Sequence, residues 1–279
     1  MEDLNFRRLK KDIYEALGFN ADQYEVKHFK RRIQSRMRAT KSADYGRYLE
    51  YLKHSTDERR KLMNALTINE TEFFRNPEVY LAFQEKFLPE LFKRKSKNQR
   101  IWSLGCATGE EPYSIAMTVA EVLGKDLQNI DVRIYATDID VEALSVAKKG
   151  EYRDISKIPR EFVERYMIKM PGGKFTFKRE INEMIHFKKH DIFSDKPLKN
   201  IDVIFCRNTI IYFKKESKKE LYHLFNNSLV MGGYLILGKA ESFINHRDYG
   251  FDVLDRKNHI FKKIVDSKKP ERSNVYGFR

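Results

Sequence analysis

Hydrophobic positions follow different patterns in the two parts of the chain. The first 66 residues lack the glycine-rich turns that punctuate strands, which favours a series of short helices. Within them, residues 26–41 place four apolar side chains on one helical face: Val26, Phe29, Ile33 and Met37. We predict a helical N-terminal domain that, together with its linker, spans residues 1–76.

After an Asn76-Pro77 connector, a helical stretch to about Arg94 leads into alternating strand-like and helical segments. The apolar, strand-like segments are 100–105, 132–139, 184–192, 201–206, 232–238 and 259–264. The helical segments among them are 111–124, 141–150 and 215–230. This alternation is typical of an α/β fold with a doubly wound, mainly parallel sheet. We predict such a domain over residues 77–279, with ligands bound beyond the carboxyl ends of the strands.

Residues 151–183 interrupt the alternation. Pro171-Gly172-Gly173, followed by KFTFKRE at 174–180, predicts a tight turn that leads into a short strand. We therefore expect a small inserted antiparallel β subdomain, built as a hairpin accompanied by a helix.

Composition narrows the class of protein. Two cysteines, Cys106 and Cys206, are too few for a disulfide framework or a thiolate zinc site. The seven histidines show no metal-ligand spacing, so we expect no metal. No segment approaches the roughly 20 apolar residues of a membrane span, and the N-terminus lacks the apolar region of a signal peptide. We expect a cytoplasmic protein, not inserted in the membrane and monomeric.

The net charge of +14 predicts an acidic partner: nucleic acid, an anionic membrane surface or a carboxylate-rich protein. Residues 26–41 carry seven basic residues and no acidic one. On the helical wheel, the basic residues that project opposite the apolar face are Lys27, Arg31 and Arg38. Such a face is either a solvated surface or a binding surface, and the lack of compensating acids keeps binding open.

Unusual polar residues follow four of the predicted strands. After the first, at 105–111, two glutamates stand where a dinucleotide fold would bind phosphate, although they suit a helix N-terminus or a cationic ligand. Asp138 ends the second strand, where an acid commonly binds ribose hydroxyls, although a helix N-cap would explain it equally well. The other two positions are Asp191-Ile192 and Arg207-Asn208. Together they favour S-adenosylmethionine, which is cationic and lacks a pyrophosphate, over a nicotinamide cofactor.

Five ordered motifs resemble those of the chemotaxis receptor methyltransferases, the CheR family. They are TINETEFFR (67–75), IWSLGCATGEEPYSIAM (101–117), YATDID (135–140), IFCRNTIIYF (204–213) and GGYLILGKAES (232–242). The resemblance implies methyl transfer from S-adenosylmethionine to glutamate side chains on the cytoplasmic helices of chemoreceptors. The products would be a glutamyl methyl ester and S-adenosylhomocysteine.

The resemblance also implies roles for individual residues. Asn69, Thr71 and Arg75 would fold over the cofactor, and Glu110 would bind its amino end. Asp138 would bind the ribose, and Asp191 with Ile192 would lie near the adenine. Arg207 and Asn208 would line the pocket, and Tyr212 would lie near the transferred methyl. The basic helix would bind the receptor through Lys27, Arg31 and Arg38, because the 171–173 turn is shorter than in members that dock a receptor tail.

The implied reaction needs no general base, because a glutamate carboxylate, with a reference pKa of about 4.3, is already ionised at neutral pH. Methyl transfer then depends on alignment and desolvation. Two roles are open for Arg207: it orients the incoming carboxylate through a charge-assisted pair, or it braces the pocket. Tyr212 would position the reacting groups.

Two other classes of function fit the sequence less well. A nucleic-acid methyltransferase would suit the charge, but the chain lacks both the Asn/Asp-Pro-Pro-aromatic run of amino methylases and the Pro-Cys of cytosine C5 enzymes. A non-catalytic relative would be expected to have lost pocket residues that are present here. The GHSES stretch common in the family reads GKAES at 238–242; its histidine is absent, and we expect no catalytic role there. Packing roles are expected for Phe73, Phe74, Trp102, Tyr113 and both cysteines.

Overall fold

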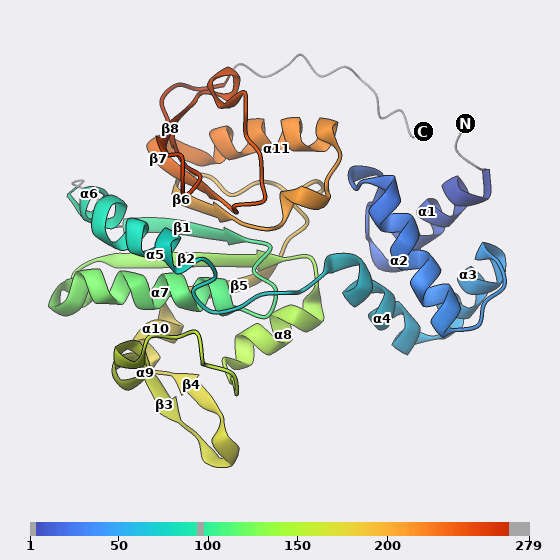
Figure 1. Ribbon diagram of the computed structural model, residues 1–279, viewed down its shortest axis with the longest axis horizontal. Helices are drawn as coiled ribbons and strands as arrows, with labels where there is room; N and C mark the ends of the chain where they lie inside the picture. The colour runs from blue at the N-terminus through green and yellow to red at the C-terminus, as the bar shows by residue number, and fades with distance from the viewer. Residues whose placement is uncertain (1–3, 94–97, 268–279) are drawn as a thin grey trace.

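A computed structural model describes residues 4–93 and 98–267 (Figure 1). The N-terminal domain consists of four α-helices, α1 Leu4–Leu17, α2 Val26–Ala39, α3 Tyr45–His54 and α4 Thr56–Thr67. They enclose their own apolar core, to which α2 contributes Phe29 and Ile33. Met37 packs at the edge of this core, whereas Val26, in the first turn, is 40% exposed. The prediction of short helices is confirmed.

The second domain is built on one seven-stranded sheet with the order β5-β2-β1-β6-β7-β9-β8. Its strands are β1 Asn98–Leu104, β2 Asp131–Asp138, β5 Ile185–Lys189, β6 Ile201–Cys206, β7 Leu229–Leu237, β8 Phe251–Asp255 and β9 Ile260–Lys263. The first five strands in this order are parallel; β9 pairs antiparallel with β7, and β8 pairs antiparallel with β9. The predicted mainly parallel sheet is confirmed, with β8 as a strand that the hydrophobic pattern missed.

Helices cover both faces of the sheet because the strands are apolar on both sides. In β6, Val203 and Phe205 pack into the core on one face, and Ile204 and Cys206 pack into the core on the other. The covering helices are α5 Pro77–Ala82, a π-helical turn Phe83–Phe87, α6 Leu88–Phe92, α7 Glu110–Leu123, α8 Val141–Lys149 and α11 Lys215–Ser228. The predicted end of the first helical stretch, near Arg94, lies outside the described residues.

The inserted subdomain projects from the sheet domain as a hairpin between two short helices (Figure 1). Its elements are α9 Arg160–Tyr166, β3 Met167–Lys169, β4 Phe175–Phe177 and α10 Arg179–Glu183, and β3 pairs antiparallel with β4. Tyr113 of α7 attaches it: its ring stacks on Phe177 at 4.0 Å, and its hydroxyl donates to Asn182 Oδ1 at 3.1 Å. The predicted inserted β subdomain is confirmed.

The residues expected to have packing roles are buried. They are Phe73, Phe74, Trp102, Tyr113, Cys106 and Cys206. Burial raises the pKa of both thiols, which keeps them protonated and unreactive. Within residues 4–93 and 98–267, no helix is both long and apolar enough to cross a membrane.

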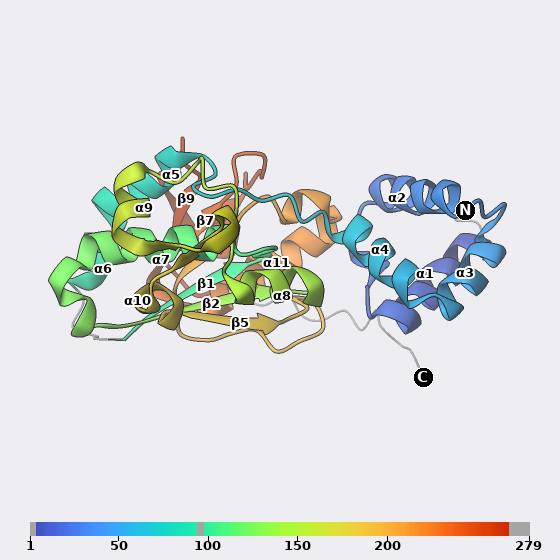
Figure 2. The ribbon, with the colours of Figure 1, turned by 90° about the horizontal axis from the view of Figure 1, so that it is seen from below.

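The helical domain lies beyond the carboxyl ends of the parallel strands (Figures 1 and 2). The segment after α4 then crosses to α5 over this edge of the sheet (Figure 2). This arrangement positions residues 67–76, between the two domains, where the polar strand ends meet.

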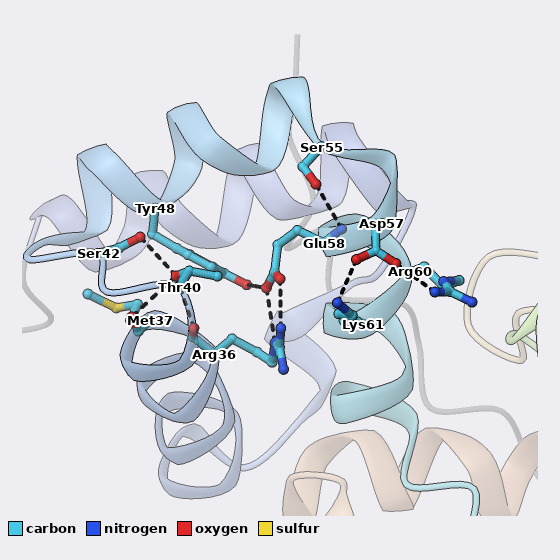
Figure 3. Close-up of polar contacts among 10 residues, drawn as sticks. All are labelled: Arg36, Met37, Thr40, Ser42, Tyr48, Ser55, Asp57, Glu58, Arg60 and Lys61. Carbon is cyan, nitrogen blue, oxygen red and sulfur yellow. Dashed lines mark hydrogen bonds and ion pairs between the residues drawn. The ribbon is translucent and has the colours of Figure 1, made fainter.

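A buried carboxylate joins three helices of the N-terminal domain. Figure 3 shows Glu58 of α4 between Arg36 of α2 and Tyr48 of α3. Its Oε2 accepts from Arg36 Nη2 at 2.7 Å, and its Oε1 accepts from the Tyr48 hydroxyl at 2.8 Å. Glu58 is 2% exposed, so the charge depends on these two partners. The neighbouring Asp57, by contrast, forms its ion pairs with Lys61 and Arg60 in solvent.

We expect Glu58→Gln to lower the free energy of unfolding by about 2 kcal/mol, because the amide removes the charge that pairs with Arg36 and leaves one acceptor oxygen for three donors. Urea denaturation measures the change. The matched control is Asp57→Asn, one residue away and exposed, for which a much smaller change is expected. Equal effects of the two substitutions would contradict the assignment of Glu58 as the centre of the domain.

Candidate functional site

A cavity lies at the carboxyl edge of the sheet, beneath residues 67–75. Four strands contribute to its walls through the residues at or after their ends: Leu104 and Gly105, Thr137 and Asp138, His190 to Phe193, and Arg207 to Thr209. The helical domain contributes Tyr24. The cavity has the position at which α/β sheets bind ligands.

The structure brings the predicted catalytic and cofactor-binding residues together around this cavity, with one exception. Those on its walls are Asn69, Thr71, Arg75, Asp138, Asp191, Ile192, Arg207, Asn208 and Tyr212. Glu110 does not line the cavity: its Oε2 accepts from Thr108 Oγ1 at 2.7 Å. Its neighbour Glu111 does line it, although the motif alone did not distinguish the two glutamates.

Glu111 is held from two sides. Its Oε1 accepts from Ser103 Oγ at 2.8 Å, and its Oε2 lies 3.6 Å from Nη1 of Arg207. Burial raises the pKa of the Glu111 carboxyl, and the Arg207 charge opposes that rise. A carboxyl so placed on the wall can accept hydrogen bonds from a cationic group.

Asp138 fixes the loop that follows the first strand. Its Oδ2 accepts from the Ala107 backbone N–H and its Oδ1 from that of Asp140, both at 2.9 Å. Burial raises the pKa of the Asp138 carboxyl, while these backbone hydrogen bonds lower it. Because a carboxylate oxygen can accept two hydrogen bonds, each retains one for a ligand hydroxyl. The alternative role of helix N-cap belongs to Asp140, whose Oδ1 accepts from two N–H groups of α8.

Asp140 also fastens the segment above the cavity. Its Oδ2 accepts from Asn69 Nδ2 at 2.7 Å and from Thr67 Oγ1 at 3.1 Å. Between these two residues, Ile68 has a φ of 45°, a rare conformation for a β-branched residue. Asn69 is thus fixed to the sheet domain as well as placed on the cavity wall.

Asp191 shapes the turn after β5. Its Oδ1 accepts from the Phe193 backbone N–H at 2.9 Å, and its Oδ2 accepts from Ser194 Oγ at 2.8 Å. Ile192, which is 8% exposed, adds an apolar patch beside it. This combination of a polar turn and an apolar side chain suits a flat heterocycle.

Protein groups bind both terminal nitrogens of the Arg207 guanidinium. Its Nη2 donates to the Arg75 carbonyl at 2.6 Å and to Asn76 Oδ1 at 2.9 Å, and its Nη1 donates to the Tyr80 hydroxyl at 3.3 Å. It also lies 5.5 Å from the centre of the Tyr80 ring. Of the two roles open for Arg207, these contacts favour bracing of the pocket.

The loop that contains Arg207 is anchored by Glu241, a residue of the GKAES stretch. Its carboxylate accepts from the backbone N–H groups of Thr209 at 2.7 Å, Ile210 at 3.0 Å and Gly238. A Cβ on Gly238 would come within 2.8 Å of the Asn208 nitrogen, so the loop requires glycine there. Lys239, at the position of the missing histidine, lies at the surface and pairs with Glu78.

Tyr212 is held by the helical domain. Its carbonyl accepts from the Glu25 backbone N–H at 2.9 Å, and the guanidinium of Arg32 lies 5.0 Å from the centre of its ring. Arg32, 8% exposed, also donates to the Leu66 carbonyl at 2.6 Å. No spacing rule in the sequence connects Arg32 with Tyr212.

The predicted receptor-binding residues lie away from the cavity. Lys27, Arg31 and Arg38 are exposed on α2, while Arg32 and Arg36 of the same helix point inward to Leu66 and Glu58. The helix therefore has one basic side that contacts the rest of the protein and one exposed basic side, the free basic face, formed by Lys27, Arg31 and Arg38.

Comparison with known proteins places this architecture in a family. Residues 4–67 match the model described as CheR methyltransferase, all-alpha domain, and residues 69–259 match CheR methyltransferase, SAM binding domain. The chemotaxis protein methyltransferase of Borreliella burgdorferi is 32% identical over 86% of this chain and 89% of its own length. That of Listeria monocytogenes is 33% identical over 88% and 92%, and that of Escherichia coli 31% identical over 94% and 92%.

The chain is also 31% identical to an uncharacterized 104.1 kDa protein of Rhodobacter capsulatus, of which it spans 29%. The two family matches adjoin one another and together cover most of the chain, in the order that the structure shows. The chain therefore belongs to the CheR family of S-adenosylmethionine-dependent methyltransferases.

Proposed function

We propose that this protein methylates glutamate side chains on the cytoplasmic helices of chemoreceptors and so serves adaptation in chemotaxis. The observation that carries the proposal is that Asp138, Glu111 and Tyr212 line the same cavity. This cavity lies beneath a linker that Asp140 and Arg207 hold in place. The relatives named as chemotaxis protein methyltransferases supply the biological setting. Such an enzyme would act in the cytoplasm as a monomer.

The walls fit S-adenosylmethionine, which supplies an electrophilic methyl group when bound. Asp138 retains acceptor capacity for the ribose hydroxyls, and Asp191 with Ile192 offers a polar and apolar border for the adenine. Oδ1 of Asn208 is buried on the cavity wall and has no hydrogen-bond partner within the described residues. That acceptor and the Glu111 carboxylate would receive the cofactor's ammonium group, in place of the expected Glu110. Asn69, Thr71 and Arg75 would cover the cofactor.

The reaction would form one O–CH₃ bond and break one C–S bond, with the electron pair returning to sulfur. No proton is transferred, because the glutamate arrives as a carboxylate. The role of the protein is then to align the carboxylate with the methyl and to exclude water. Tyr212 would align the reacting groups, and Arg207 would maintain the pocket.

The free basic face of α2 would bind acidic receptor helices through Lys27, Arg31 and Arg38. These residues lie on the same helix as Arg32, which contacts the Tyr212 ring. The same helix would thus bind the receptor through its exposed face and contact Tyr212 through its inward face. Nucleic acid is not the proposed partner.

The proposed function is tested by incubating the protein with methyl-labelled S-adenosylmethionine and a receptor cytoplasmic fragment. We expect label on the receptor that is released as methanol by mild base, since glutamyl methyl esters hydrolyse readily. Glutamate-to-glutamine changes at the modified receptor sites should abolish it. Base-stable label, or label on RNA or DNA instead, would overturn the proposal.

The role of Asp138 is tested by binding of S-adenosylhomocysteine in calorimetry. Asp138→Asn should weaken binding at least tenfold, because the amide removes the charge and one acceptor from the ribose site. Asp131→Asn, at the other end of β2 and exposed, is the matched control and should bind as wild type does. Unchanged affinity in a folded Asp138→Asn protein would exclude a ribose-binding role.

Arg207 and Tyr212 should differ in kinetic behaviour. If Arg207 braces the pocket, Arg207→Lys should weaken S-adenosylhomocysteine binding about tenfold, because lysine cannot replace both hydrogen bonds that the guanidinium donates to the Arg75 carbonyl and to Asn76 Oδ1. Tyr212→Phe should lower kcat at least tenfold and leave that binding within twofold of wild type. If Arg207→Lys changed only the KM for the receptor, the arginine would be a substrate ligand.

The receptor surface is tested by replacing Lys27, Arg31 and Arg38 together with glutamine. The variant should bind an acidic receptor fragment at least tenfold more weakly at low salt and lose part of the salt dependence. A triple glutamine variant at Lys86, Lys125 and Lys257 carries the same charge change on other exposed surfaces. Equal loss in both variants would show that only net charge matters.

A further inference from the structure

Tyr24 of the helical domain, far from the linker in sequence, lines the cavity directly. It lies between a short 3-10 turn at Ala21–Gln23 and the start of α2. The resemblance to the family assigned cofactor contacts only to the linker and the sheet domain. Tyr24 therefore extends the cavity wall with a residue of the helical domain.

The backbone around Tyr24 is docked on the sheet domain in a fixed register. Tyr24 forms a β-bridge with Phe213, flanked by hydrogen bonds from the Glu25 N–H to the Tyr212 carbonyl and from the Lys214 N–H to the Gln23 carbonyl, both at 2.9 Å. Gln23 also accepts a hydrogen bond from the buried Ser217 hydroxyl through its Oε1. These contacts place the Tyr24 side chain reproducibly, since a shift by one residue would turn it to the opposite side.

The ring of Tyr24 is clamped between two aromatic side chains. Phe19 stacks on it at 4.5 Å, and Phe213 meets it edge-on at 4.8 Å. With the ring fixed, the hydroxyl has a defined position and an unused donor: within the described residues it forms no hydrogen bond.

Phe213 connects Tyr24 to the turn after β5. Its ring lies 4.8 Å from that of Tyr24 and 5.0 Å from that of Phe193, which follows Asp191 and Ile192 in the turn. In the proposed arrangement this turn lies beside the adenine, so Tyr24 lies on the nucleoside side of the cavity. Burial raises the pKa of its hydroxyl, which therefore remains a donor at neutral pH.

We propose that Tyr24 is a cofactor-binding residue, which closes the nucleoside end of the cavity and donates a hydrogen bond to the bound nucleoside. The helical domain then completes the cofactor site in addition to the receptor-binding role proposed for α2. This inference rests on the use of S-adenosylmethionine and is independent of whether glutamate is the substrate.

Calorimetry with two ligands tests the assignment in the full chain. Tyr24→Phe should weaken S-adenosylhomocysteine binding about three- to tenfold through loss of the hydroxyl, and Tyr24→Ala more than tenfold through loss of the ring as well. 5′-Methylthioadenosine has the nucleoside but lacks the amino acid, so its binding should weaken by the same factors. The matched control is Tyr14→Ala, an exposed tyrosine of the same domain, expected within twofold of wild type.

Thermal unfolding identifies variants that fail to fold. If Tyr24→Ala fails to fold, Tyr24→Phe alone tests the cofactor-binding role. Wild-type affinity for S-adenosylhomocysteine in Tyr24→Phe would overturn the proposed hydrogen bond. A loss confined to S-adenosylhomocysteine, with 5′-methylthioadenosine unaffected, would place Tyr24 at the amino acid end and contradict the proposal. Neither readout requires a receptor, so a failure of the glutamate proposal would leave this test intact.

Discussion

The segment between the two domains is fixed at both ends by buried side chains, and the cavity depends on that fixation. Asp140, after β2, binds Thr67 and Asn69 at its start, and Arg207, after β6, binds the carbonyl of Arg75 at its end. Because parallel strands end at one edge of a sheet, both anchors stand on the same side. The segment therefore crosses that edge and covers the cavity. Positive φ values at Ile68 and Asn76, near the two anchors, show that contacts dictate its conformation.

Charge is distributed unevenly around the cavity. The sheet domain presents the buried carboxyl groups of Asp138 and Glu111, which suit a cation such as a sulfonium or an ammonium. The helical domain presents Arg32 against Tyr212, with the free basic face of α2 outside it. In the proposed function, the cationic cofactor would meet the carboxyl groups of the sheet domain, and the anionic substrate the basic residues of the helical domain. In the proposed reaction, their charges meet only where the methyl is transferred.

The sequence was informative where one local pattern determines one element, and less so where two distant segments meet. Apolar alternation predicted the parallel strands, and polar residues at their ends predicted the position of the cavity and part of its wall; the linker residues and Tyr212 followed only from the family resemblance. It could not distinguish Glu110 from Glu111, because their difference arises from the direction of each side chain in the first turn of α7. It gave no sign of Tyr24 or Arg32 at the site, since both reach it only through the docking of one domain on the other.

The most direct measurement is a crystal structure of the protein with S-adenosylhomocysteine. We expect the ligand beneath residues 67–75, with its ribose hydroxyls on the Asp138 carboxylate and its amino group near Glu111 and Asn208. The Tyr24 hydroxyl should lie within hydrogen-bond distance of the nucleoside. A ligand outside this cavity, or one bound in the reverse orientation with its adenine at Glu111, would contradict the account.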